Sequence, residues 1–284
     1  MRTTVYERGV EEEWGVARPA RPSRMAGVSM AGFCGRSAGP VDAPVLPHPG
    51  VTLVVEFGSG LLVVDDAAGR QQRGSLVAGL ASGAVRMRGE RIECVEVRLS
   101  PLVARTVLGV SPAELDRGLL SLDDVWGDEA ARIRERLNDA PSWQARFALA
   151  DALLARRGGT GPRVDPEVAA AWHRIVADHG LVRIEDLAAE TGWTRRRLWG
   201  RFRSQIGVPP KSAARLVRFS RAAQRLAAGL SATRVAAECG YADQSHLHRE
   251  VLAFTTLTPT MLAGNPGAAA NGVAWAGRAV GETA

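Results

Sequence analysis

A dense run of arginines is the part of the sequence with the clearest capacity for chemistry. Five of the nine residues from 195 to 203 are arginines. A guanidinium group binds phosphate oxygens and can present two parallel donors to the edge of a guanine base. Five such side chains distributed around a helix cannot all reach one partner, so we expect most of them to face phosphate or water. The run therefore favours binding of nucleic acid over catalysis.

A repeated pattern surrounds this run. The segments LAAETGW and VAAECGY begin 48 residues apart, and each has an alanine four residues before a glycine, Ala188 with Gly192 and Ala236 with Gly240. In a helix-turn-helix the first helix packs closely on the second, which requires a small residue at the crossing. The turn that follows requires a residue that tolerates positive φ. Two copies of the pattern predict two helix-turn-helix motifs.

The residues after each glycine predict the second helix of each motif. Thr194 and Asp243 stand where an N-cap would accept hydrogen bonds from the first backbone amides of these helices. Apolar residues recur at matching offsets, and the expected buried positions are Leu198, Phe202 and Ile206 in one helix and Leu247 and Val251 in the other. We also expect Trp172 and Trp193 in the core, whereas Trp199 lies beside the buried stripe and fits either a core or a contact role.

The segment between the two copies predicts one long helix. Residues 211–228 contain neither glycine nor proline. A rigid helix of this length would fix the separation of the two recognition helices. They could then enter successive major-groove segments on one face of DNA, about 34 Å apart.

The net charge of +6 is confined to the same region. Residues 161–264 contain 15 Lys and Arg against 9 Asp and Glu, whereas the rest of the chain has 21 of each. A basic segment beside a neutral one indicates a nucleic-acid-binding domain attached to another domain. A solvated basic face with no partner is the alternative on charge alone.

The preceding region reads as short strands followed by helices. We expect strands at 51–57, 61–64, 75–80, 84–87 and 92–99, and helices at 123–137 and 142–157, with a capping box formed by Ser111 and Glu114. Short strands at this spacing are typical of a small antiparallel barrel or sandwich. Such an element could hold a ligand in its mouth, or could have a filled core and serve only to dimerise.

These patterns together predict an α+β fold in which a β-rich barrel or sandwich with helices precedes an all-α domain of two helix-turn-helix motifs joined by a long helix. The expected divisions are a loosely ordered lead-in at 1–48 with one strand around 27–34, a sensing or dimerisation domain at 49–157, a Gly/Pro-rich linker at 158–163, a DNA-binding domain at 164–264 and a disordered tail at 265–284.

Other kinds of site find little support. The three cysteines, Cys34, Cys94 and Cys239, form no CxxC pair, and His246 and His248 do not share a helix face. We therefore expect no disulfide, no metal ion and no cofactor. No common catalytic motif occurs, so we do not expect an enzyme. No signal peptide or long apolar run is present, which predicts a cytoplasmic protein without a membrane span.

Residues 167–263 resemble the double helix-turn-helix DNA-binding domain of the AraC/XylS family of bacterial transcription regulators. The run GYADQSHLHREV is similar to the family's signature in its second motif, and VEVRLSP and LLSLDDVWG resemble parts of the β-rich N-terminal domain of actinobacterial members. The resemblance implies a transcription regulator that binds double-stranded DNA and RNA polymerase. It also implies a homodimer and a small-molecule or protein effector at the N-terminal domain.

The resemblance further implies which side chains meet DNA. The corresponding residues are Thr194, Arg195, Arg196, Trp199, Gly200 and Arg203 in the first motif, and Gln244, Ser245, His248 and Arg249 in the second. Arg196 could form a bidentate contact with guanine, and Gln244 suits adenine. Trp199 could pack on a thymine methyl group.

The sequence departs from the family at several positions. Gly200 stands where the family often has arginine, Val251 replaces a usual Phe, Leu252 a usual basic residue, and Thr256 a usual Gly. We therefore expect the second motif to dock weakly and to contribute mainly phosphate contacts.

Two other classes of protein remain as alternatives. Some DNA-repair alkyltransferases carry the same motif pair beside a zinc-bound cysteine, but the first two cysteines of this chain lack the neighbouring cysteines that such a site needs. A scaffold protein that binds no DNA is the other alternative.

Overall fold

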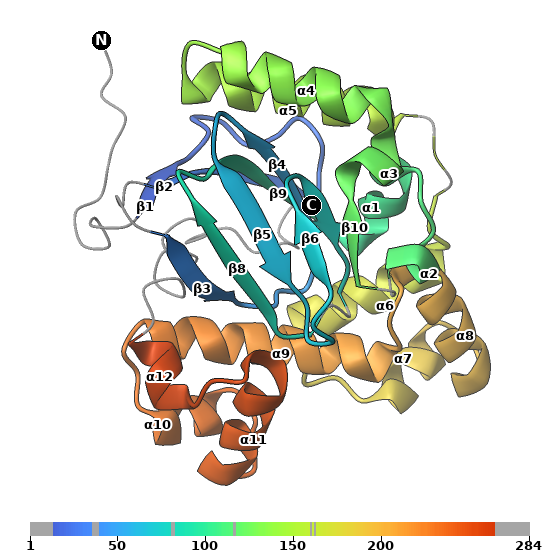
Figure 1. The fold of residues 1–284 in the computed structure, drawn as a ribbon. Coiled ribbons are helices and arrows are strands. Elements are labelled where there is room, and N and C mark those ends of the chain that lie inside the picture. Colours follow the sequence, from blue (N-terminus) through green and yellow to red (C-terminus); the bar gives the residue numbers. More distant parts are fainter. Residues whose placement is uncertain are drawn as a thin grey trace.

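The fold is α+β, as predicted, with a β-rich N-terminal part and a helical C-terminal part (Figure 1). The computed structural model describes residues 14–35, 40–80, 83–115, 118–159, 161 and 163–264. The predicted tail at 265–284 lies outside these residues, and so does part of the predicted linker at 158–163. None of the described helices combines the length and the apolar character that a membrane crossing requires.

Two antiparallel sheets form the N-terminal part. The strands are β1 Trp14–Ala17, β2 Val28–Gly35, β3 Val41–Val45, β4 Val51–Phe57, β5 Leu61–Asp65, β6 Gln71–Arg73, β7 Leu76–Ala78, β8 Val85–Glu90, β9 Glu93–Leu99 and β10 Leu119–Ser121. One sheet has the order β1-β2-β9-β4-β7-β10, and the other has the order β3-β8-β5-β6. The alternation along β4 directs Val51, Leu53 and Val55 into the helix-covered core and Thr52 and Val54 into the space between the sheets.

Helices cover the outer face of the larger sheet. They are α1 Pro101–Leu108, α2 Pro112–Leu115, α3 Leu122–Trp126, α4 Asp128–Asp139 and α5 Trp143–Gly158. The capping box expected before α2 is present, since Ser111 N donates to Glu114 Oε2 at 2.6 Å and Glu114 N donates to Ser111 Oγ at 3.4 Å. The single helix expected at 123–137 is instead two, α3 and α4. Gly127, with φ 55° and ψ −135°, interrupts it, a conformation that ends one helix and starts the next.

The expectation of a loosely ordered lead-in at 1–48 is wrong for its described residues. β1, β2 and β3 all lie in this segment, and β2 pairs with β9 over Val28 to Cys34 and with β1 on its other side. The strand expected at 27–34 corresponds to β2. These strands are stabilised by hydrogen bonds to distant parts of the chain, which a weak local pattern does not reveal.

Seven helices form the C-terminal part over its described residues, 163–264: α6 Pro166–Ala177, α7 Ile184–Glu190, α8 Arg195–Ile206, α9 Pro210–Ala227, α10 Ala232–Glu238, α11 Gln244–Thr255 and α12 Pro259–Ala263. They enclose two apolar cores. Trp172, Leu198 and Phe202 belong to one of them, and Phe219 and Leu247 belong to the other. The long helix α9 contributes residues to both cores, so both motifs pack against the same helix.

The two parts of the chain are in contact. In Figure 1, α9 crosses below the ends of the sheets, with α6 to α8 toward one end and α10 to α12 toward the other. The helices α1 and α2 pack against α8. Leu46, in the loop after β3, is buried in the core of the second motif, and Leu80 contacts the cores of both motifs. The sheet loops therefore touch the helical C-terminal part directly.

Candidate nucleic-acid interface

The first motif is formed by α7, a short turn and α8. Ala188 is buried at the crossing of the helices, and Trp193 N donates to its carbonyl oxygen at 3.0 Å. Gly192 has φ 66°, and a Cβ at this position would meet nothing within 4 Å. The glycine is therefore required by backbone conformation and not by space, as the sequence pattern suggested.

The ends and the buried face of α8 fix its orientation. Thr194 Oγ1 accepts a hydrogen bond from Arg197 N at 3.3 Å, and Gly207 ends the helix with φ 99°. Leu198 and Phe202 are fully buried, and the Phe202 ring lies 6.5 Å from that of Trp172. The opposite face of α8 is exposed.

The exposed face of α8 carries the side chains that the sequence places on DNA. Arg195, Arg196, Trp199 and Arg203 are all exposed, and the Trp199 side chain is 47% accessible. The guanidinium of Arg203 lies 5.3 Å from the centre of the Trp199 ring, within range of a cation–π interaction. An apolar ring and a positive charge are thus held together on the exposed face.

The arginines of α8 have different surroundings. Arg195 Nη1 lies 3.2 Å from Glu185 Oε1, and the guanidinium of Arg197 covers the ring of Trp193 at 4.5 Å. Arg201 donates from Nε and Nη2 to Asp165 Oδ2, at 2.8 and 2.6 Å. Arg201 therefore ties α8 to the start of α6. Arg196 has no partner among the described residues, which leaves its guanidinium available for a base edge.

The interaction with Arg201 also affects the pKa of the Asp165 carboxyl. Burial acts to raise the pKa of the Asp165 carboxyl, but hydrogen bonds with Arg201 and Gln205 lower it below its ordinary value. Gln205 Oε1 also accepts a hydrogen bond from the backbone N of Asp165 at 2.7 Å. These contacts give Arg201 and Gln205 structural roles on α8.

The second motif repeats the geometry of the first. Ala236 is buried, and Tyr241 N donates to its carbonyl oxygen at 2.9 Å. Gly240 has φ 69°, so backbone conformation requires glycine here as well, and the one close atom that a Cβ would meet is the end of the exposed Leu181 side chain. Asp243 caps α11, accepting a hydrogen bond at Oδ1 from His246 N at 2.6 Å.

The predicted DNA-binding side chains of the second motif also lie together. Gln244, Ser245, His248 and Arg249 are exposed on α11, while Leu247 is fully buried beneath them. The hydroxyl of Thr233 donates to Gln244 Oε1 at 3.4 Å, which links the start of α11 to α10. This face has a single arginine, and the exposed face of α8 has several.

A buried carboxylate that the sequence analysis missed anchors α11. The Glu250 side chain is only 6% exposed, and its two oxygens lie 3.0 Å from Arg215 Nη2 and 3.2 Å from Arg218 Nη2, both on α9. The guanidinium of Arg218 also lies 4.6 Å from the centre of the Tyr241 ring. The interaction fixes the rotation of α11 on α9, and thereby which residues of α11 face outward. In the sequence, the only signal for this interaction is a pair of arginines three residues apart, Arg215 and Arg218, on the long helix expected at 211–228.

Other polar groups of this part contribute no further site. Cys239 is buried, and burial raises the pKa of its thiol. The ring of His246 packs edge-on against Tyr241 at 5.2 Å. Burial raises the pKa of the Tyr241 hydroxyl to about 12. Within the described part of the chain, no group of three or more His, Cys, Asp or Glu could hold a metal ion.

The fold and the exposed basic helices define a helix-turn-helix protein. Residues 187–264 match the family model described as a helix-turn-helix domain. This match confirms a helix-turn-helix domain over the residues that carry both predicted motifs.

Several solved structures are similar to the chain. ToxT from Vibrio cholerae is 12% identical, with 84% of this chain and 98% of that chain covered and a TM-score of 0.48. The C-terminal domain of AraT, a response regulator from Geobacillus stearothermophilus, is 18% identical over 36% of this chain and 88% of that chain, with a TM-score of 0.34. The AraC-like transcriptional activator CuxR is 13% identical over 71% and 84% of the two chains, with a TM-score of 0.31. No curated protein matches the sequence.

Proposed function

We propose that the protein reads two successive major-groove segments of DNA, one with α8 and the other with α11. The observation that carries the proposal is that two helix-turn-helix motifs share α9, and each directs an exposed polar face of its second helix away from the core. A single long helix in both cores holds these faces at a fixed separation, as a double major-groove contact requires.

The proposed mechanism is binding without catalysis. Arginines of α8 neutralise phosphates and release counterions, which gives most of the affinity and makes it depend on salt. Arg196 reads guanine, Trp199 packs on a thymine methyl group, and Gln244 reads adenine. Arg195, which pairs with Glu185 in the free protein, exchanges this partner for a phosphate.

Footprinting tests the assignment. Arg196→Ala and Arg249→Ala should each weaken protection in one half of the site, and the double variant should lose specific protection. Arg132→Ala is the matched control, because Arg132 is exposed on α4 in the N-terminal part. Equal protection by the wild type and the double variant would contradict the proposal.

Salt titration gives a second measurement. Replacing Arg195 by alanine should reduce the slope of log affinity against log salt by about one if Arg195 contacts a phosphate. A scaffold that binds no DNA predicts no binding to genomic fragments even at low salt.

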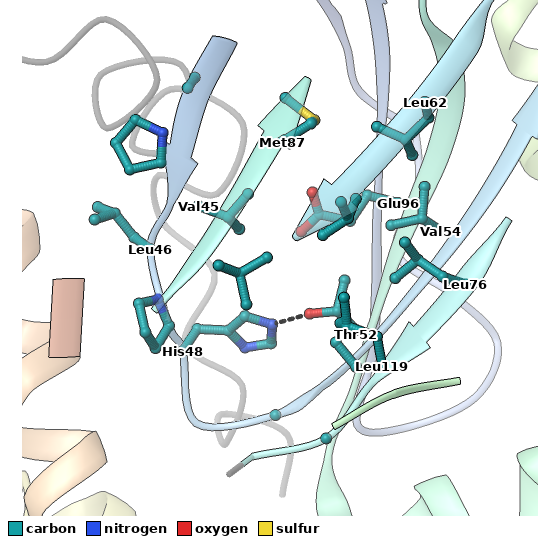
Figure 2. A pocket seen from close by; sticks show the side chains of 18 of the residues that line it. Val45, Leu46, His48, Thr52, Val54, Leu62, Leu76, Met87, Glu96 and Leu119 are labelled. Atoms are coloured by element: carbon teal, nitrogen blue, oxygen red, sulfur yellow. Dashed lines mark hydrogen bonds between the residues drawn. The ribbon is translucent and has the colours of Figure 1, made fainter. Parts of the chain in front are cut away.

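We further propose that the N-terminal part binds a small-molecule effector. Its two sheets enclose a largely apolar cavity of about 140 Å³ (Figure 2). Leu46 and Leu80 line this cavity and also pack against the cores of the DNA-binding motifs. A ligand that displaced either side chain would act directly on the packing around α9.

A protein effector is the alternative. It predicts that light scattering of the full chain in the presence of fractionated cell extract shows a gain in mass of the size of a partner. We also propose RNA polymerase as a partner and a homodimer as the assembly, following the resemblance stated above. Light scattering of the purified chain measures the dimer directly.

A further inference from the structure

The cavity between the sheets is large enough for one small ring-shaped molecule, such as a benzene derivative. Its volume of about 140 Å³ is close to that of an engineered cavity of about 150 Å³ that binds benzene. Apolar side chains make up most of its wall, among them Val54, Leu62, Val64, Leu76 and Met87. A ligand of this cavity would therefore be compact and largely apolar.

Among the described residues that line the cavity, one carries a charge, and it is negative. Figure 2 shows the Glu96 carboxylate directed into the cavity, and among the described residues that line the cavity there is no lysine or arginine. Arg98 Nε donates to Glu96 Oε1 at 3.0 Å, and the two side chains are 6% and 18% exposed, respectively. Because Glu96 lines the cavity and Arg98 does not, a ligand meets the carboxylate and not the guanidinium.

His48 supplies a second polar anchor. Its Nε2 lies 2.7 Å from Thr52 Oγ1, whereas its Nδ1 is shielded from solvent and has no hydrogen-bond partner among the described residues. Gly50 leaves room beside this nitrogen, since a Cβ there would lie 3.0 Å from it. Burial lowers the pKa of His48 well below its ordinary value, and the charge of Arg98 lowers it further. The imidazole is therefore neutral at pH 7 and offers no positive charge to an anion.

We infer that the cavity binds a compact, ring-sized apolar molecule that carries a hydroxyl or amine donor, and that it discriminates against a carboxylate of the same size. A donor group gains a charge-assisted hydrogen bond with Glu96, which is about twice as strong as a neutral one. A carboxylate would instead place two like charges close together in an apolar enclosure. The inference rests on the proposed effector function of the N-terminal part, because it names the ligand class of that site.

Calorimetric titration of the full-length protein with matched probes tests the discrimination. The probes are p-cresol, benzylamine and p-toluate, which share one ring and differ in their polar group. We expect p-cresol and benzylamine to bind more than about tenfold tighter than p-toluate, because juxtaposed like charges cost several kcal/mol. Equal or tighter binding of p-toluate would overturn the inference, and so would the absence of binding by all three probes.

Neighbouring valines on β5 locate the site. Val64 lines the cavity, and Val63, the next residue on the strand, is directed to the other face of the sheet. Val64→Phe should fill the cavity and abolish binding of p-cresol, whereas Val63→Phe makes the same substitution and should preserve it. Binding that survives Val64→Phe would place the ligand elsewhere and contradict the inference.

A charge-removing variant tests the role of Glu96. Glu96→Gln keeps the size of the side chain and removes the negative charge that lines the cavity. The preference for p-cresol over p-toluate should then fall toward equal affinity. An unchanged preference for p-cresol in a variant with an unaltered circular dichroism spectrum would contradict the role given to Glu96. The valine pair tests the inference independently if this variant does not fold.

The same preparation should also be assayed for DNA binding. A protein that binds DNA but none of the probes contradicts the ligand inference alone. A protein that binds p-cresol but no DNA contradicts the proposed DNA-reading function alone.

Discussion

The two helix-turn-helix motifs have the same local geometry but are held in place by different interactions. The recognition helix α8 packs on an apolar core, is tied to α6 through Arg201 and Asp165, and contacts α1 and α2 of the N-terminal part. The recognition helix α11 is anchored to α9 through Glu250 and its two arginines. Both helices pack on apolar cores, but the first is tied by an ion pair to α6, whereas the second is tied by a buried carboxylate to the shared helix α9.

The two helices also differ in what they present to DNA. The exposed face of α8 carries several arginines beside Trp199, whereas that of α11 carries one, Arg249. This difference supports the prediction that α8 supplies most of the electrostatic affinity. It further suggests that α11 contributes chiefly to register.

The largest effect should follow from removing the anchor of α11. Glu250→Ala leaves Arg215 and Arg218 without their partner and should lower the free energy of unfolding by about 2 kcal/mol, less than for a fully buried pair because Arg215 is half-exposed. Footprints should lose protection of one half-site and keep the other. Glu135→Ala, at an exposed position on α4, is the control. A uniform loss over both half-sites would refute the separate anchoring of α11.

An effect of similar size is expected on recognition by α8. Arg196→Ala should weaken binding to the specific site by about 1–3 kcal/mol and relax the preference at one base pair. Competition binding against a set of single-base variants of the site measures both. If the loss is the same for every sequence, Arg196 contacts phosphate and does not read a base.

Exchanging the residues that end the two recognition helices should have smaller and opposite effects. Both helices end in a left-handed residue, Gly207 with φ 99° in the first and Thr256 with φ 61° in the second. A β-branched residue is strained in this conformation. Thr256→Gly should therefore stabilise the protein by about 1 kcal/mol, and Gly207→Thr should destabilise it by at least as much. Urea unfolding of the two variants measures both changes, and effects of the same sign would contradict this account.

The smallest effect concerns the helical glycine of α8. A Cβ at Gly200 would meet nothing within 4 Å, so Gly200→Ala should stabilise the helix by about 0.5–1 kcal/mol. Thermal unfolding measures the change. Gly192→Ala is the contrasting variant, because the positive φ of Gly192 should make the same substitution destabilising.

The sequence predicted the motifs well because their signals are local. A cap, a small residue four positions before a glycine and an apolar period each act within one or two turns of helix, so Thr194, Ala188 and Gly192 could be placed from the sequence alone. Before residue 48 the sequence predicted one strand, around 27–34, and missed β1 and β3, because β3 pairs with β8, which begins 40 residues after the end of β3.

The missed parts of the candidate sites depend on tertiary geometry. Glu250 meets Arg215 and Arg218 only once the rotation of α11 on α9 is known. The cavity likewise exists only after the two sheets are stacked. The sequence therefore could not show that residues such as His48 and Glu96 line a cavity. Arg201 was grouped with its neighbours on α8, because its partner Asp165 lies 36 residues earlier.

The continuity of α9 through both cores has a consequence for the DNA itself. A linker of flexible residues would let the protein accept half-sites at several distances. A helix packed into both cores can neither lengthen by the rise of one base pair nor twist by the rotation that accompanies it. One inserted base pair would turn the second half-site by about 34° around the duplex and carry it away from α11. Operators of this protein should therefore keep an invariant number of base pairs between their two halves, even where the intervening sequence varies freely.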